Sequence, residues 1–195
     1  MTKPLRLFIA IELSSQVKQA LGDLQAELRR QLPAKAVRWT NPEGIHLTLK
    51  FLGDTPPERV GSIGQALARA AAGFEPFSFA VAGFGCFPNL HKANVLWAGV
   101  PQVPKALAGL QRATELHLGQ LGYAKDGRDF SPHLTLGRVN RQIPGAERKA
   151  LAGVLGQVEV GSLGVVPVER VLLFKSDLQP GGAVYSVLST ASLAG

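Results

Sequence analysis

"HLTLKFLG" at residues 46–53 and "HLTLGR" at residues 133–138 repeat one tetrapeptide in a chain that has only four histidines. Apolar and polar residues alternate in both copies, which is typical of a β-strand with one buried face. Strict alternation predicts that His46, Thr48 and Lys50 share one face of the first strand. The opposite face, toward the core, then receives Leu47, Leu49 and Phe51.

The second copy repeats this arrangement, with His133 and Thr135 on the outward face and Leu134 and Leu136 toward the core. Arg138 closes this copy, and strict alternation would direct it to the leucine side. Gly137, just before it, can carry a β-bulge that returns Arg138 to the histidine face. We therefore include Arg138 among the expected site residues.

An imidazole and a hydroxyl two residues apart on a strand lie about 6.5 Å from each other and can converge on one phosphate group. Two such strands facing each other would place a histidine on either side of one phosphorus atom. A neutral imidazole could then accept a proton from the nucleophile while a protonated imidazole gives one to the leaving oxygen. The threonines and Arg138 would stabilise the charge on the phosphoryl oxygens.

The histidines do not form the patterns expected of a metal site. Neither motif contains His-x-His or His-x-x-x-His, no acidic cluster adjoins them, and Cys86 is the only cysteine. His91 and His117 occur singly, in a predicted turn and a predicted helix. No Walker-type phosphate loop is present, so the use of ATP is not indicated.

Composition bounds the class of protein. With 195 residues, 46% hydrophobic and 18% charged, the chain fits a soluble globular fold. The net charge of +7 favours anionic partners such as RNA, nucleotides or acidic membranes, although a solvated basic surface would give the same number. The lone cysteine, and the absence of an uncharged apolar run near 20 residues, favour a cytoplasmic location without membrane insertion.

The remaining patterns predict a mixed order of strands and helices. Strands are expected at 5–13, 37–39, 77–87, 93–100, 157–166, 168–178 and 183–193, besides the two motif strands. Helices are expected at 15–30, 58–72, 104–121 and 146–155. Strands follow one another too often for a doubly wound parallel sheet, which indicates an α+β fold. The strand-helix-strand plan around each motif suggests an ancestral duplication.

Four segments together resemble the RNA 2′,3′-cyclic phosphodiesterase branch, also called 2′-5′ RNA ligase, of the 2H phosphoesterase superfamily. They are "RLFIAIEL" at 6–13, "IHLTLKFLGD" at 45–54, "FSPHLTLGR" at 130–138, and "LFKSDLQPGGAVYSVL" at 173–188, which contains the turn "QPGG". The resemblance implies a single bilobal α+β domain over residues 1–195. Its two pseudo-symmetric lobes would each hold an antiparallel sheet flanked by helices, with an active-site cleft between them.

The resemblance also implies a reaction, in which water opens a terminal 2′,3′-cyclic phosphate of RNA and leaves a 2′-phosphomonoester. His133 would be the proton acceptor and His46 the proton donor, while Thr48, Thr135 and Arg138 hold the phosphate. No metal and no cofactor are implied. The partner is RNA with 2′,3′-cyclic phosphate ends, and we expect a monomer without an obligate protein partner. Attack by a 5′-hydroxyl in place of water would give ATP-independent ligation.

Phe130, just before "SPH", is a candidate to stack on the terminal base, whereas Trp39 fits core packing better. Basic residues near the second motif either attract RNA or form a solvated surface; they are Arg128, Arg141, Arg148 and Lys149. Two other functions stay open from the sequence. One is a module that binds RNA or nucleotide phosphates without turning them over. The other is a phosphodiesterase for ADP-ribose 1″,2″-cyclic phosphate, another small cyclic phosphate or 2′-5′ oligonucleotides.

Overall fold

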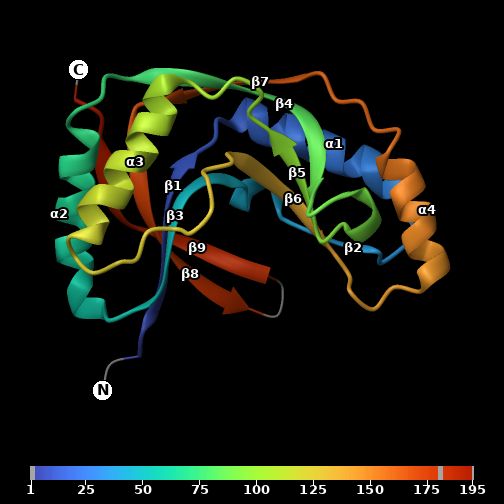
Figure 1. The fold of residues 1–195 in the computed structure, drawn as a ribbon, viewed down its shortest axis with the longest axis horizontal. Helices are drawn as coiled ribbons and strands as arrows, with labels where there is room; N and C mark the ends of the chain where they lie inside the picture. Colours follow the sequence, from blue (N-terminus) through green and yellow to red (C-terminus); the bar gives the residue numbers. More distant parts are fainter. Residues whose placement is uncertain (1–2, 180–181, 195) are drawn as a thin grey trace.

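A computed structural model describes residues 3–179 and 182–194 and shows two antiparallel sheets with four α-helices around them (Figure 1). The predicted α+β class is confirmed. Pro180 and Gly181 of the "QPGG" turn lie outside the described residues. Among the described residues, no helix combines the length and the apolar character needed to cross a membrane.

The first sheet has four strands in the order β3-β1-β8-β9, and all neighbours are antiparallel. Its strands are β1 (Leu5–Glu12), β3 (His46–Thr55), β8 (Arg170–Gln179) and β9 (Gly182–Ser192). The first His-Leu-Thr-Leu motif opens β3, an edge strand. One edge of this sheet therefore presents the motif.

The second sheet has five strands in the order β2-β6-β5-β4-β7, again antiparallel throughout. Its strands are β2 (Val37–Trp39), β4 (Phe77–Phe87), β5 (Val95–Gly99), β6 (His133–Val139) and β7 (Ser162–Val168). β7 starts five residues later than the 157–166 strand expected from sequence. The second motif opens β6, which lies between β2 and β5.

The helices cross between the sheets. α1 (Ser15–Gln31) follows β1 of the first sheet but packs on β7 of the second. α3 (Lys105–Gly119) follows β5 of the second sheet but packs on β3 and on α2 (Val60–Ala71) beside the first. α4 (Gly145–Leu155) contacts the turn between β4 and β5 (Figure 1). The connection from β1 to its neighbour β3 thus contains α1, which packs on the second sheet. The connection from β5 to its neighbour β6 contains α3, which packs on the first sheet.

The two faces of the first sheet bury different side chains. Leu7, Ile9 and Ile11 of β1 belong to the large hydrophobic core, which extends through both sheets and their helices. The opposite face carries a second, smaller cluster made of Phe8, Ala10, Leu172 and Phe174, with Tyr185 packed against it. This second face is the one on which the first motif lies.

The predicted orientation of Lys50 and Phe51 was wrong. Ile9 of β1 pairs with Lys50, whereas Ala10 pairs with Thr48, so Leu49 is an extra residue on β3. This bulge interrupts the alternation. Lys50 therefore points into the core and is 3% exposed, while Phe51 points to the His46 face and is 62% exposed.

The charge of the buried Lys50 side chain is compensated by a carboxylate. Its Nζ lies 2.6 Å from Oε2 of Glu115 on α3 and 2.7 Å from the carbonyl oxygen of Ala124. Gln111 donates a further hydrogen bond to the Glu115 carboxylate. Because Ala124 belongs to the segment that leads into β6, Lys50 connects the first motif strand with the approach to the second.

We predict that Lys50→Met lowers the free energy of unfolding by about 3–5 kcal/mol, because it leaves the Glu115 charge buried without a partner. Lys50→Met combined with Glu115→Leu should recover most of this loss, since no uncompensated charge remains. Urea denaturation measures both. Lys175→Met is the matched control, because its partner Asp177 is partly exposed and the loss should stay below about 1 kcal/mol. A loss for Lys50→Met as small as that of the control would contradict the prediction.

Candidate active site

The two motif strands lie against each other although they belong to different sheets. β3 contacts β6, and both run through the middle of the molecule (Figure 1). His46, Thr48, His133 and Thr135 are each half-buried, whereas the intervening leucines are fully buried. The histidine-threonine faces predicted from the alternation are therefore confirmed.

Both histidines are held in the same way. Nδ1 of His46 lies 2.9 Å from the carbonyl oxygen of Gly44, and Nδ1 of His133 lies 2.7 Å from that of Ser131. A carbonyl oxygen only accepts, so Nδ1 carries the proton and donates it in both rings. When either imidazole is neutral, its Nε2 is consequently the basic nitrogen and is left for a ligand.

His46 lies among aromatic side chains of the first sheet. Its ring stacks on Phe8 at 4.5 Å between centroids, and Tyr185 meets it edge-on at 5.1 Å. Burial lowers the pKa of His46 from 6.5 to about 4, and the hydrogen bond to Gly44 opposes this only in part. Desolvation disfavours the charged ring, so His46 is neutral at pH 7 in the unliganded protein.

His133 has a different aromatic neighbourhood. Phe87 meets its ring edge-on at 5.0 Å, and Trp97 lies 6.5 Å away. The Trp97 indole spreads over Gly85 of the neighbouring strand, where an added Cβ would stand 2.3 Å from Cζ2 of the indole. Glycine at position 85 therefore gives this indole the space that it occupies beside His133.

Arg138 returns to the exposed face through a bulge, although the extra residue is Leu136 and not the predicted Gly137. On β5, Trp97 pairs with Thr135 and Leu96 pairs with Gly137, so Leu136 is the extra residue. Gly137 is buried and Arg138 is exposed on the histidine face. Burial raises the pKa of the Tyr185 hydroxyl, and the charges of Arg138 and Arg6 oppose that increase. Arg138 of the second sheet thus lies near Tyr185, which contacts His46 on the first.

The bulge at Leu136 is fixed from behind by Gln25. This side chain of α1 is 2% exposed, and its Nε2 donates to the carbonyl oxygens of Leu136 and Thr40, at 2.8 Å each. The Leu136 carbonyl oxygen also accepts a hydrogen bond from the backbone amide of Thr40 at 2.9 Å, so two donors together hold the bulge in place. Gln25 is therefore a positioning residue for Arg138, and it has no sequence signal beyond a polar residue on an apolar helix face.

Phe51 is a second residue that the sequence reasoning missed. It occupies the same place after the first bulge as Arg138 does after the second. Its ring lies 6.0 Å from that of Phe8, on which His46 stacks. The repeat itself could have predicted this position: if the first copy had the same bulge that was expected in the second, Phe51 would point outward.

Two further observations bound the chemistry of this region. Phe130 is half-buried and packs against the large core, so less of its ring is free than of Phe51. Within residues 3–179 and 182–194, no three His, Cys, Asp or Glu side chains are grouped so that they could hold a metal ion. The groups gathered here are two imidazoles, two hydroxyls and a guanidinium.

We predict that the low pKa of His46 makes folding stability depend on pH. Between pH 6.5 and about 4 the unfolded chain protonates this residue and the folded protein does not, so stability falls as the pH is lowered through that window. The loss should reach roughly 3 kcal/mol at its lower end. Urea denaturation at pH 7 and pH 4.5 should show a smaller pH effect for His46→Gln than for the wild type. His91→Gln, which removes an exposed imidazole, is the control, and an equal pH effect in all three would contradict the assignment.

Comparisons with known proteins agree with this geometry. The family described as LigT like Phosphoesterase matches the chain twice, over residues 11–97 and 99–185, with one motif in each match. An RNA 2′,3′-cyclic phosphodiesterase of Methanothermobacter thermautotrophicus is 33% identical over 93% of this chain and 95% of its own. The Thermus thermophilus protein of the same name is 35% identical over 98% of this chain and 91% of its own.

Solved structures show the same fold. The crystal structure of TT0787 of Thermus thermophilus has a TM-score of 0.77 and 30% identity, covering 97% of this chain and 98% of that one. E. coli LigT complexed with 3′-AMP has a TM-score of 0.78 over 98% of this chain and 99% of that one, and at 22% identity it supports the fold alone. From the double family match and these relatives, the chain belongs to the LigT-like phosphoesterases, a family of the 2H phosphoesterases.

Proposed function

We propose that this enzyme hydrolyses 2′,3′-cyclic phosphate ends of RNA to 2′-phosphomonoesters by two-histidine acid-base catalysis without a metal ion. The observation that carries the proposal is the pair of His-x-Thr strands in contact, each with its Nδ1 bound to a backbone carbonyl and its Nε2 left for a ligand. The relatives named RNA 2′,3′-cyclic phosphodiesterase support the choice of substrate.

In the proposed step, Nε2 of His133 takes a proton from water while the water oxygen attacks phosphorus. The bond between phosphorus and O3′ breaks, and His46 gives O3′ its proton. The products are a 2′-phosphate and a free 3′-hydroxyl. Thr48, Thr135 and Arg138 hold the phosphoryl oxygens, which carry more negative charge in the transition state than in the substrate.

The low pKa of His46 sets a condition on this division of roles. A proton donor must be charged, yet burial keeps His46 neutral in the unliganded protein. A bound phosphate anion near the ring favours the charged form and raises the pKa again. We therefore infer that His46 gains its proton with the substrate. A 5′-hydroxyl that replaces water in the same step would produce a 2′-5′ linkage, which is the ligation branch of the proposal.

We predict that His46→Ala and His133→Ala each lower kcat by roughly 10²–10⁴-fold, the usual contribution of a positioned proton-transfer group. The assay uses an oligoribonucleotide with a 2′,3′-cyclic phosphate end, in EDTA and without ATP, and identifies the product end. His91→Ala should match the wild type. Intact substrate with the wild type, a 3′-phosphate product, or faster turnover of ADP-ribose 1″,2″-cyclic phosphate or a 2′-5′ oligonucleotide would overturn the substrate or the mechanism.

Phe51 is proposed to stack on the base of the terminal nucleotide. Its exposed ring lies next to the Phe8 ring that supports His46, so a base there would be within one nucleotide of the reacting phosphate. Stacking on an aromatic side chain contributes about 1–3 kcal/mol per base. The earlier candidate, Phe130, stays a prediction.

We predict that Phe51→Ala raises KM for adenosine 2′,3′-cyclic phosphate by roughly 5- to 100-fold with little change in kcat, because the lost stacking serves the bound base. Steady-state kinetics measure both constants. Phe51→Trp keeps an aromatic face and should restore KM. An unchanged KM in Phe51→Ala, or a failure of the tryptophan variant to rescue it, would count against stacking.

A further inference from the structure

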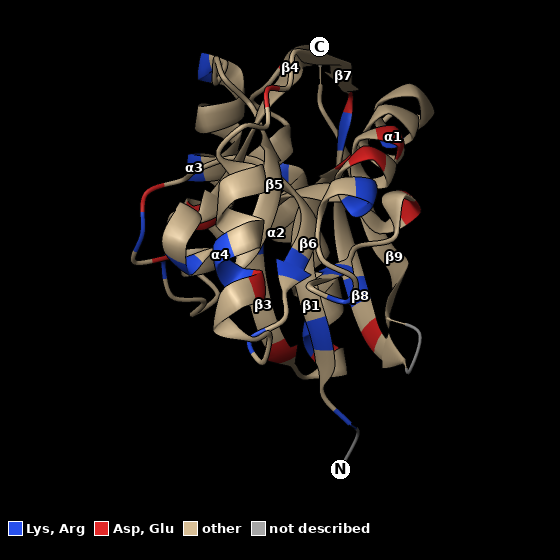
Figure 2. Ribbon diagram, turned by 90° about the vertical axis from the view of Figure 1, so that its right-hand side faces the viewer, with Lys and Arg blue, Asp and Glu red and all other residues tan. Residues whose placement is uncertain are grey.

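A basic groove of about 550 Å³ adjoins the site at Arg138. It is lined by Lys35, Val37, Arg38, Asn94, Arg138, Val139, Asn140 and Arg141. These residues supply four cationic side chains and two amides, and none of them is acidic. The volume is in the range of ligand sites in proteins. In Figure 2, basic positions on β6 and β1 face the viewer on this side of the molecule.

Two of the cations stand directly opposite each other. Arg38 of β2 pairs with Arg138 of β6 in the sheet register, and both are exposed. Like charges across a strand pair destabilise the sheet. Among the ion pairs of residues 3–179 and 182–194, neither arginine has a carboxylate partner. A nucleic-acid backbone that places a separate phosphate at each guanidinium group would relieve this repulsion.

The groove is built from backbone that is already fixed. The amide of Asn140 donates to the carbonyl oxygen of Ala36 at 2.8 Å, and that of Val139 donates to Asn94 at 2.9 Å. Arg148 of α4 donates to the carbonyl oxygens of Asn140 and Arg141. The guanidinium of Arg148 thus holds the backbone of the groove wall at Asn140 and Arg141.

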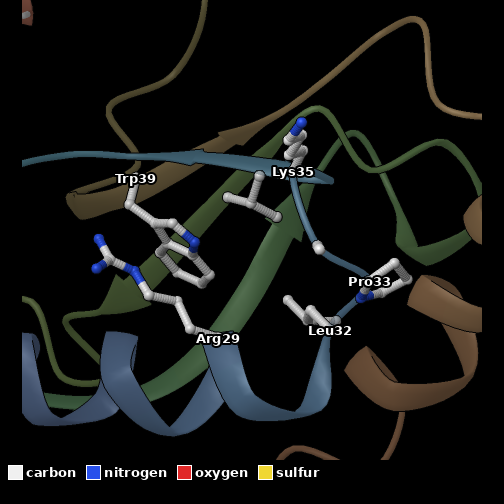
Figure 3. A pocket seen from close by; sticks show the side chains of 7 residues that line it. Arg29, Leu32, Pro33, Lys35 and Trp39 are labelled. Carbon is white, nitrogen blue, oxygen red and sulfur yellow. The ribbon is translucent and has the colours of Figure 1, made fainter.

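A neighbouring cavity of about 270 Å³ shares Lys35 and Val37 with the groove but has a different character. Figure 3 shows the Arg29 guanidinium beside the Trp39 indole, with Leu32 and Pro33 farther along the cavity. Arg29 already lies 5.5 Å from the centre of the Trp39 ring, in a cation-π contact. The three arginines of the basic groove, Arg38, Arg138 and Arg141, do not line this cavity.

We propose that the basic groove binds the sugar-phosphate backbone of single-stranded RNA on the 5′ side of the terminal cyclic phosphate. This inference rests on the proposed function, since Arg138 would hold the reacting phosphate at one end of the groove. Arg38, Arg141 and Lys35 would meet the phosphates that precede it. Arginine, lysine and asparagine are the side chains that usually contact nucleic-acid phosphates and sugars, and the groove has no aromatic face for a base.

The test is the double variant Arg38→Gln/Arg141→Gln, assayed on two substrates. For a six-nucleotide RNA with a 2′,3′-cyclic phosphate end, kcat/KM should fall at least roughly tenfold relative to the wild type, because two phosphate contacts are lost. For adenosine 2′,3′-cyclic phosphate, which has no preceding phosphate, kcat/KM should stay unchanged. Arg69→Gln/Arg112→Gln is the control, since it removes two exposed arginines from α2 and α3, on the far side of the first sheet. An equal loss on both substrates would overturn the groove assignment.

A binding measurement separates this inference from the proposed function. Fluorescence anisotropy with a six-nucleotide RNA that ends in a 3′-hydroxyl requires no catalysis. The slope of log K against log salt should be less steep by about 1.4 in the double variant than in the wild type, for two single-strand phosphate contacts. If hydrolysis fails but this shift is found, the groove stands and the proposed reaction falls. If hydrolysis succeeds and the double variant binds RNA like the control, the groove assignment falls.

Discussion

One extra residue in each motif strand decides which side chains meet at the site. In β3 and β6 the extra residue is the fourth of the motif, Leu49 or Leu136, so the alternation changes sides directly after His-x-Thr. The second residue after the threonine, which strict alternation would place outward, therefore points inward. The third residue after the threonine points outward. Phe51 and Arg138 therefore occupy equivalent places in the two halves, one offering an aromatic surface and the other a positive charge.

The inward position after each bulge meets a different constraint. At Gly137 an added Cβ would lie 2.7 Å from Cγ1 of Val37 and 3.1 Å from the Arg38 carbonyl oxygen, so β2 can pair closely with β6 only because the residue is glycine. In β3, an edge strand, the same position has room for Lys50, whose charge needs Glu115 of α3. This ion pair therefore links the first motif strand to the helix that precedes the second motif in the chain.

Sequence patterns predicted the features that depend on local alternation. The half-buried His-x-Thr faces follow from period two and were confirmed. Arg138 is exposed, as the predicted bulge requires, but the extra residue is Leu136 and not Gly137. Lys50 and Phe51 were placed wrongly because nothing within β3 resembles a bulge signal; the shift becomes apparent only when the two copies are superposed. The crossing of α1 and α3 to the opposite sheets depends on contacts between distant segments, as does the bond from Gln25 to Leu136. Strand and helix propensities carry no information about such contacts.

The two histidines have identical motifs but different surroundings, because the neighbouring side chains of each sheet differ. His46 lies against Phe8, Phe174 and Tyr185, which exclude water from its ring and lower its pKa to about 4. His133 has Phe87 and Trp97 beside it, from the other sheet. The two-histidine mechanism that we propose needs one charged and one neutral imidazole, and the burial of His46 is an asymmetry between the two copies of the motif that bears on it. Arg138, near Tyr185, would draw the phosphate anion toward His46, and that anion is the group that can return the proton to the buried ring.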